Sequence, residues 1–177
     1  MSEAKAFVPV KLICGMISSQ DIVFKNAENI LGDLYGPIDY FSPFINFTFT
    51  DYYEKEMGEN LKRKFLSFQK LIPPENLSEI KIRTNEIEVN LKQEYKTSFR
   101  IMNLDPGLLT ASSLLMATAK DFSHRVPLQN GIYAHLEFLF GKKNIRTLDW
   151  TYSDYKTEDY QNFFFTVRKI YMDQLKS

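Results

Sequence analysis

Residues 103–128 read NLDPGLLTASSLLMATAKDFSHRVPL and combine a turn signal, an apolar segment and a cluster of charged groups. The Asp-Pro-Gly triplet at 105–107 predicts a turn or a helix start, because aspartate caps free amide groups and proline suits the first helical position. The apolar residues that follow recur at helical spacing, so we expect a helix over 108–119. The Lys-Asp-x-x-His-Arg cluster at 120–125 holds one of only two histidines and is the first candidate for a site.

Upstream of this stretch, the hydrophobic pattern alternates between strand and helix periods. The first helix is expected to end at Gly36-Pro37, which is the usual order of these residues past a C-terminus. The second has a repeating apolar face, with Glu79, Lys81 and Lys92 on its solvent side. The predicted elements are a strand over 10–17, a helix over 21–34, strands over 45–50 and 62–72, a helix over 77–91 and a strand over 98–104.

Downstream, the sequence predicts a hairpin and a last helix. Asn130-Gly131 is a strong signal for a tight turn, and it joins the apolar segments 125–128 and 132–140. Along the second segment Tyr133, His135 and Glu137 alternate with apolar residues, so the two sets face opposite ways. Residues 141–146 are a polar loop, and Thr157 begins a C-terminal helix rich in aromatic side chains.

These elements predict an α+β fold with a ferredoxin-like core. The order β-α-β-β-α-β matches the split βαβ arrangement, and a helix, a β-hairpin and a second helix extend it toward the C-terminus. We expect one domain over residues 1–177, with residues 1–6 as a disordered tail, because no linker divides the chain.

Composition narrows the functional classes. Lys plus Arg and Asp plus Glu both number 22, and this balance disfavours a dedicated nucleic-acid-binding protein, although a local basic patch remains open. The single Cys14 allows neither an intrachain disulfide nor a cysteine-based zinc site. No apolar run reaches membrane-spanning length and no secretory signal is present, so we expect a cytoplasmic protein without a membrane partner.

Seven strings along the chain resemble one prokaryotic family, which is catalogued as domain of unknown function 4416. The resemblance extends from Val10 to Tyr171. It implies no established activity, because the role of the family is not known. The strings are FTDYYEKEMG at 49–58, LKRKFLSF at 61–68, IKIRTNEIE at 80–88, NLDPGLLT at 103–110, ATAKDFSHRVPL at 117–128, GIYAHLEF at 131–138 and WTYSDY at 150–155.

Some members of that family carry a GTP-binding label, and this sequence gives the label no support. The phosphate-binding pattern GxxxxGK[ST] is absent, and Gly32 and Gly36 are followed by Asp33 and Pro37. The chain departs from the family pattern at two points. Asp149 precedes Trp150 where proline is usual, and His135 stands where an acidic residue is common.

The polar residues in these strings predict a cleft that binds a small phosphorylated ligand or a nucleotide, with or without a divalent cation. Carboxylates and an imidazole suit such a cation, and lysine or arginine suits a phosphate. We assign catalytic roles to Asp105, Asp121 and His124. The expected ligand-binding residues are Asp51, Tyr52, Glu56, Lys62, Lys120, Arg125, Tyr133 and Trp150.

Two alternatives stay open. Exposed aromatic residues on a ferredoxin-like sheet can stack on bases, which would make the chain a non-catalytic RNA- or nucleotide-binding module. The residues expected on this base-stacking surface are Tyr52, Tyr53, Tyr133, Trp150, Tyr152 and Tyr155, with Lys62, Arg63 and Arg125. The same polar residues also suit turns, caps and surface ion pairs in a module that binds a protein partner. The sequence specifies neither a cofactor nor an oligomeric state.

Overall fold

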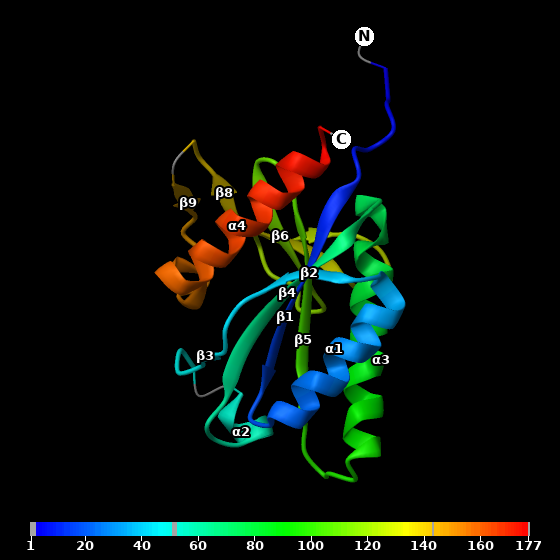
Figure 1. Ribbon diagram of the computed structural model, residues 1–177, viewed down its shortest axis with the longest axis vertical. Helices are drawn as coiled ribbons and strands as arrows, with labels where there is room; N and C mark the ends of the chain where they lie inside the picture. Colours follow the sequence, from blue (N-terminus) through cyan, green and yellow to red (C-terminus); the bar gives the residue numbers. More distant parts are fainter. Residues whose placement is uncertain (1–2, 51–52, 143, 177) are drawn as a thin grey trace.

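The computed structural model describes residues 3–50, 53–142 and 144–176. Within these ranges the chain forms an α+β fold with one nine-stranded sheet and four α-helices (Figure 1). The strands are β1 (Val10–Ser18), β2 (Ile38–Phe41), β3 (Ile45–Asn46), β4 (Lys62–Ile72), β5 (Asn103–Leu109), β6 (Ser113–Thr118), β7 (Val126–Pro127), β8 (Tyr133–Phe140) and β9 (Ile145–Thr147). The helices are α1 (Asp21–Tyr35), α2 (Glu54–Met57), α3 (Leu77–Glu94) and α4 (Glu158–Gln174), with 3-10 turns η1 (Pro74–Asn76) and η2 (Asp154–Lys156).

The strands pair in the order β2-β4-β1-β5-β6-β8-β7, with β3 added to β4 and β9 added to β8. All the pairings that involve these strands are antiparallel. The α1 helix joins β1 to β2, and β4 lies between those two strands. The predicted positions of α1, β4, α3 and α4 are confirmed. In the described ranges, no helix has the length and apolar character needed to cross a bilayer.

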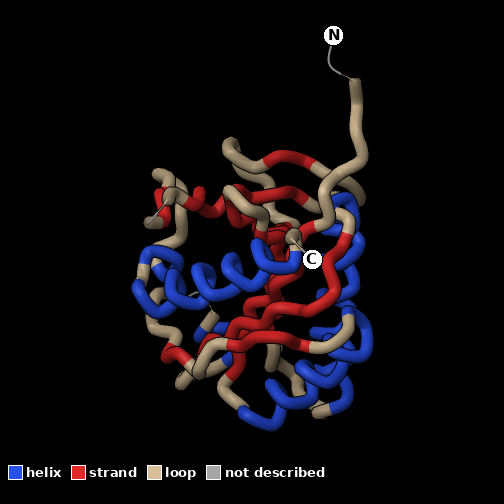
Figure 2. The backbone as a smooth tube through the Cα atoms, turned by 45° about the horizontal axis from the view of Figure 1, so that its top comes forward, coloured by secondary structure: helices blue, strands red, loops and turns tan. Residues whose placement is uncertain are grey.

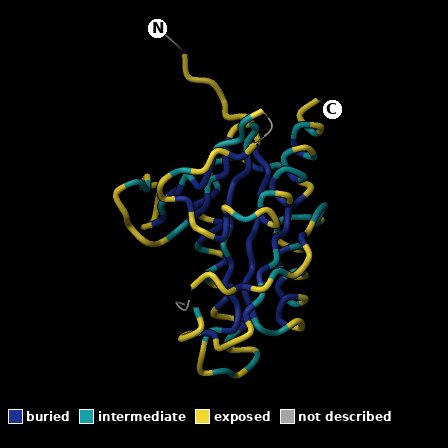
Figure 3. The backbone as a smooth tube through the Cα atoms, turned by 90° about the vertical axis from the view of Figure 1, so that its left-hand side faces the viewer, coloured by how far each residue is buried: buried dark blue, intermediate teal, exposed yellow. Residues whose placement is uncertain are grey.

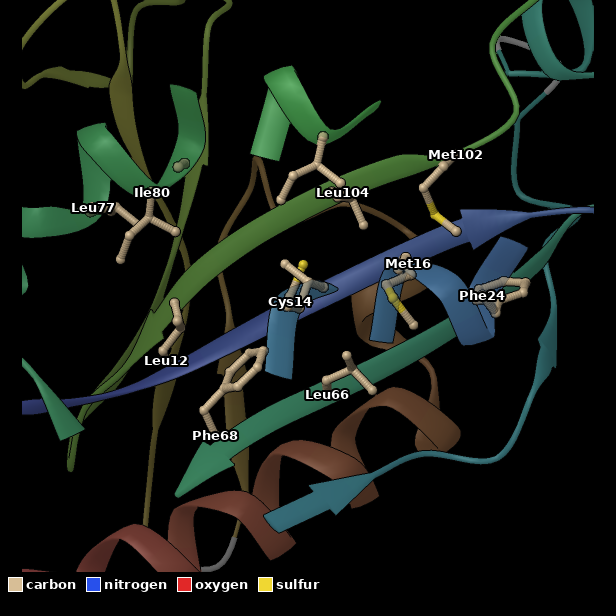
Figure 4. Packing of buried hydrophobic residues seen from close by; sticks show 14 of the residues in the cluster. Leu12, Cys14, Met16, Phe24, Leu66, Phe68, Leu77, Ile80, Met102 and Leu104 are labelled. Atoms are coloured by element: carbon tan, nitrogen blue, oxygen red, sulfur yellow. The ribbon is translucent and has the colours of Figure 1, made fainter. Parts of the chain in front are cut away.

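Helices α1 and α3 cover one face of the sheet. The apolar side chains of β1 alternate, so Leu12, Cys14 and Met16 point to this face and pack against both helices (Figure 4). Leu66 and Phe68 of β4 join the same cluster. Burial of this apolar surface fixes the positions of the two helices, because each buries one apolar stripe against the sheet.

Helix α4 crosses the opposite face (Figure 2). Phe65 of β4 is fully buried there, with its ring 5.2 Å from the rings of both Phe163 and Phe164 of α4. Phe138 of β8 joins them at 5.3 Å from Phe164. In Figure 3 the central strands form a continuous buried band, while the segment before Val10 is exposed.

The predicted helix over 108–119 is wrong, and so is the predicted turn or cap at Asp105. This segment forms a hairpin of β5 and β6, and Asp105-Pro106-Gly107 lies inside β5. The hydroxyl of Thr110 accepts hydrogen bonds from the amides of Ser112 and Ser113, and this contact fixes the turn. Pairing with β1 and β8 provides the ladder bonds that override the helical spacing of the leucines.

Strand β6 pairs with only the last part of β5, which leaves a gap in the hydrogen-bond ladder beside the first part of β5. The pairing of β5 with β6 begins at Gly107, next to Pro106, which has no amide hydrogen to donate. Before that point the side chains of α3 replace the missing strand: Glu88 accepts the amide of Leu104 at 2.6 Å, and Lys81 donates to its carbonyl at 2.8 Å. Lys81 is therefore buried, contrary to its predicted place on the solvent side of the helix.

The hairpin at Asn130-Gly131 is confirmed. Both residues have positive φ, 55° and 74°, as a type I′ turn requires. Gly131→Val should destabilise the fold by about 1 kcal/mol or more, because a β-branched residue tolerates this conformation poorly. Urea unfolding tests this. An unchanged midpoint would show that the turn does not constrain the hairpin.

Candidate functional site

A cleft of about 520 Å³ opens on the α4 face of the sheet, beside the gap between β5 and β6. Its walls come from Phe47, Phe49, Thr50 and Tyr53 between β3 and α2, from α3, and from the segment that contains η2. It combines apolar and charged side chains, as ligand pockets commonly do. The charged side chains that line it are Arg63, Lys81, Arg100, Asp105, Lys120, Glu137 and Asp154, together with His135.

Arg63 lies at the floor of the cleft and spans three strands. It projects from β4 across Gly15 of β1, and its Nη1 lies 3.1 Å from Oδ2 of Asp105 on β5. A Cβ on Gly15 would lie 2.8 Å from that Nη1 atom. The absence of a side chain at this position is therefore what lets the guanidinium reach Asp105.

Asp105 is surrounded by donors. Its Oδ2 also accepts a hydrogen bond from the Nδ2 of Asn103 at 2.6 Å, and its Oδ1 lies 3.9 Å from the Nζ of Lys81. Burial alone would raise the pKa of Asp105, but the positive charges of Lys81 and Arg63 outweigh it and hold that pKa below its usual range. Asp105 is therefore an ionised carboxylate with both oxygens facing cations.

Asp154 of η2 is the second carboxylate near Arg63, with 3.5 Å between its Oδ2 and Nη2. Burial raises the pKa of Asp154, and the guanidinium only partly offsets this. The pKa values of the two aspartates are thus shifted in opposite directions around one arginine. Carboxylates whose pKa values differ in this way suit different roles toward a ligand, one as an ion and one as a proton carrier.

Arg100 forms the wall of the cleft next to α3. Its Nη2 donates to Glu88 at 2.6 Å and to the Oδ1 of Asn103 at 2.5 Å. Because Asn103 also donates to Asp105, one chain of hydrogen bonds joins Glu88, Arg100, Asn103 and Asp105. Burial raises the pKa of Glu88 despite the opposing charge of Arg100.

His135 and Glu137 of β8 form the opposite wall. A register shift between Leu114 and Leu115 leaves Glu137 as an extra residue in β8, so His135, Glu137 and Phe138 all face the cleft side of the sheet. Bulges of this kind redirect side chains and are frequent near functional sites. Glu137 is fully buried, and its Oε1 accepts the amide of Tyr152 at 2.8 Å.

A group of rings lies outside this wall. The ring of His124 stacks on that of Trp150, with 4.8 Å between centroids and 7° between planes, and its Nε2 lies 3.2 Å from the Nδ1 of His135. Arg125 donates to the same Nδ1 at 3.3 Å and to the hydroxyl of Tyr152 at 2.7 Å. These contacts tie the segment after β6 to the cleft.

His124 is expected to titrate below its ordinary pKa of 6.5, because burial and the neighbouring His135 and Arg125 disfavour its charged form. Since the unfolded chain binds this proton more readily, stability should fall as the pH is lowered through 6.5 toward the folded-state value. NMR can follow the two histidines separately. Arg125→Gln should raise the midpoint of His124, and a midpoint at or above 6.5 in the unchanged protein would contradict the geometry.

The structure brings only part of the predicted site together. Asp105 and Lys120 line the cleft, while His124, Arg125 and Trp150 lie next to it. Lys62 faces α1 instead, where its Nζ lies 2.8 Å from Asp21. Glu56 lies 3.6 Å from Arg100. Asp121 is exposed and Tyr133 is half-buried on β8, and neither of them lines the cleft. The other two predicted residues, Asp51 and Tyr52, lie outside the described residues.

Several residues of the site were not predicted. Arg63 was expected only on the alternative base-stacking surface and not in a phosphate-binding cleft, and Arg100 lies in a loop. Gly15 is the signal that could have located Arg63, because a glycine inside an apolar strand often marks a close approach by another group. The other missed residues are Lys81, Arg100, Asn103, His135, Glu137 and Asp154, which line the cleft, and Gly15 and Glu88, which contact Arg63 and Arg100.

Among residues 3–50, 53–142 and 144–176, no three His, Cys, Asp or Glu side chains gather in a group that could hold a metal ion. In the comparisons with known proteins, no curated protein and no solved structure matches the chain. A family model, described as Domain of unknown function (DUF4416), matches residues 8–171. The chain, which matches this model over nearly its whole length, therefore belongs to the DUF4416 family.

Proposed function

We propose that the cleft binds a small phosphorylated molecule, nucleotides included, through its cationic side chains. The observation that carries this proposal is the convergence of Arg63, Lys81, Arg100 and Lys120 on one cavity of about 520 Å³. The four residues come from β4, α3, the segment before β5 and the segment after β6. Phosphate groups are recognised by such clusters of arginine and lysine donors.

The charge balance of the lining supports an anionic ligand. Four cationic side chains line the cleft together with only three carboxylates, those of Asp105, Glu137 and Asp154. The Nε of Arg63 is buried without a hydrogen-bond partner. An acceptor oxygen on the ligand would satisfy this donor. The proposal includes no metal ion, because Arg63, Asn103 and Lys81 already surround the carboxylate of Asp105.

Calorimetric titration with ribose 5-phosphate, AMP and inorganic phosphate tests this proposal. Lys120 is exposed at the cleft, so Lys120→Gln should keep the fold and weaken binding by about tenfold at low salt. Lys169→Gln makes the same charge change on an exposed site of α4 outside the cleft and should leave affinity unchanged. Equal affinities in the two variants, or no binding by any probe at millimolar concentration, would refute the proposal.

We further propose that β1, α1, β2, β4, α3 and β5 form a ferredoxin-like core. The neighbour order β2-β4-β1-β5 supports this, because β4 separates the two strands that α1 connects, as a split βαβ unit requires. The β6–β9 region and α4 would then be an addition that builds one side of the cleft. A cytoplasmic location also belongs to this proposal.

A further inference from the structure

The wall formed by His135 and Glu137 contains two buried polar atoms without hydrogen bonds. The Nε2 of His135 and the Oε2 of Glu137 lie 3.0 Å apart, yet they are not aligned for a bond with one another, and neither has another partner. His135 is 2% exposed and Glu137 is 0% exposed, and both line the cleft. Buried polar groups are normally paired, so these two atoms indicate that a ligand group completes the wall.

The hydrogen-bonding roles of the two atoms follow from their neighbours. The Nδ1 of His135 faces the Nε of Arg125, which can only donate, so Nδ1 is the acceptor and Nε2 is the donor. The Oε1 of Glu137 is already used by the amide of Tyr152, which leaves Oε2 as the free acceptor. The wall therefore presents one donor and one acceptor 3.0 Å apart.

A hydroxyl group fits this pair, because it accepts one hydrogen bond and donates another at the same oxygen. An ammonium group only donates and a phosphate oxygen only accepts, so each would leave one of the two atoms unpaired. Aromatic stacking on a base has less support, since the ring of Tyr152 already stacks on His135 and that of Tyr155 on Phe164.

We propose that the phosphorylated ligand is a sugar or polyol phosphate, with one hydroxyl bound between His135 and Glu137 and its phosphate near the cationic side chains. This inference rests on the proposed phosphate-binding function and narrows it to a ligand class. Phosphate recognition would provide affinity, and the His135–Glu137 pair would select for the hydroxyl. Sites that bond a substrate hydroxyl reject analogues that lack it, because their buried polar groups are then left unpaired.

Calorimetry with glycerol 3-phosphate and n-propyl phosphate tests the proposal, because the two have the same number of carbons and differ in their hydroxyls. Glycerol 3-phosphate should bind at least about tenfold more tightly. Equal binding would overturn the hydroxyl site and leave the phosphate site standing, whereas binding by neither compound, nor by ribose 5-phosphate, would overturn both. AMP that binds more than tenfold tighter than ribose 5-phosphate would overturn the ligand class in favour of a nucleobase.

The variant Glu137→Gln tests whether the preference for a hydroxyl-bearing ligand depends on Glu137. Its amide group would place a donor where Oε2 accepts, so the preference for glycerol 3-phosphate over n-propyl phosphate should fall to about onefold. Glu75→Gln, at an exposed position on η1 outside the cleft, should keep the full preference. A folded Glu137→Gln protein with the full preference would overturn the assignment. If this variant does not fold, the comparison of the two ligands on the unchanged protein decides the question.

Discussion

Replacing Arg63 with methionine is expected to lower the free energy of unfolding by about 3–5 kcal/mol and to abolish binding of ribose 5-phosphate. The guanidinium is almost fully buried and is shared by Asp105 and Asp154, so its removal leaves two carboxylates in the cleft with less compensation. Loss of one member of a buried ion pair costs more than the pair itself contributes, because the remaining charge keeps its desolvation penalty. Urea unfolding measures the first effect and calorimetry the second.

A double-mutant cycle separates the ion pair from simple loss of packing. Arg63→Met combined with Asp105→Asn should be less destabilising than the sum of the two single changes, because no uncompensated charge remains at Asp105. The exposed Arg146 of β9 serves as the matched control, and Arg146→Met should change stability by less than about 0.5 kcal/mol. Additive effects of the two substitutions would show that Arg63 and Asp105 do not interact in the folded protein.

Gly15→Ala should destabilise the protein by about 1–3 kcal/mol, although it adds a single methyl group. The new Cβ would lie 2.8 Å from the Nη1 of Arg63 and 3.0 Å from the Cε1 of Phe65, so the guanidinium has to move away from Asp105. Because this movement displaces a cation of the cleft, binding of ribose 5-phosphate should also weaken. Thermal and urea unfolding, followed by titration of the folded variant, measure both effects.

Gly32→Ala is a control for which the opposite change in stability is expected. Gly32 lies within α1, and an added Cβ there would meet no atom within 4 Å. Alanine is favoured over glycine inside a helix, so this substitution should stabilise the fold by about 0.5–1 kcal/mol. If Gly15→Ala were also neutral or stabilising, the path of Arg63 across β1 would be wrong.

The helices and long strands could be predicted because their signals are local. The α1 helix follows from apolar spacing and ends at Gly36, which has φ 95°, as the sequence indicated. The prediction of a helix over 108–119 was wrong because the leucines of this segment fit a helical period. The hydrogen bonds that hold it as a hairpin in the sheet involve β1 and β8, which lie outside the segment. Such partners cannot be seen in a local pattern.

The sequence could predict only those site residues whose chemical type and surrounding motif both indicate a site. Asp105 and Lys120 stood out in their motifs and do line the cleft. Glu137 looked like one member of a regular alternation that shares a face with His135, and the bulge that also turns Phe138 to this face depends on the register with β6. Lys81 resembled a solvated helix residue, but the missing amide of Pro106 and the gap in the ladder draw it into the sheet.

An NMR titration of ¹⁵N-labelled protein with ribose 5-phosphate tests most directly whether this cleft is a binding site. The largest amide shift changes should fall on Thr118 at the end of β6, on Lys120 just after it, and on Tyr152 and Tyr155 around η2, because these segments line the cleft from two sides. Saturating changes confined to these segments would support the site. Changes centred on α1 or on the turn at Asn130, or none at millimolar ligand, would contradict it.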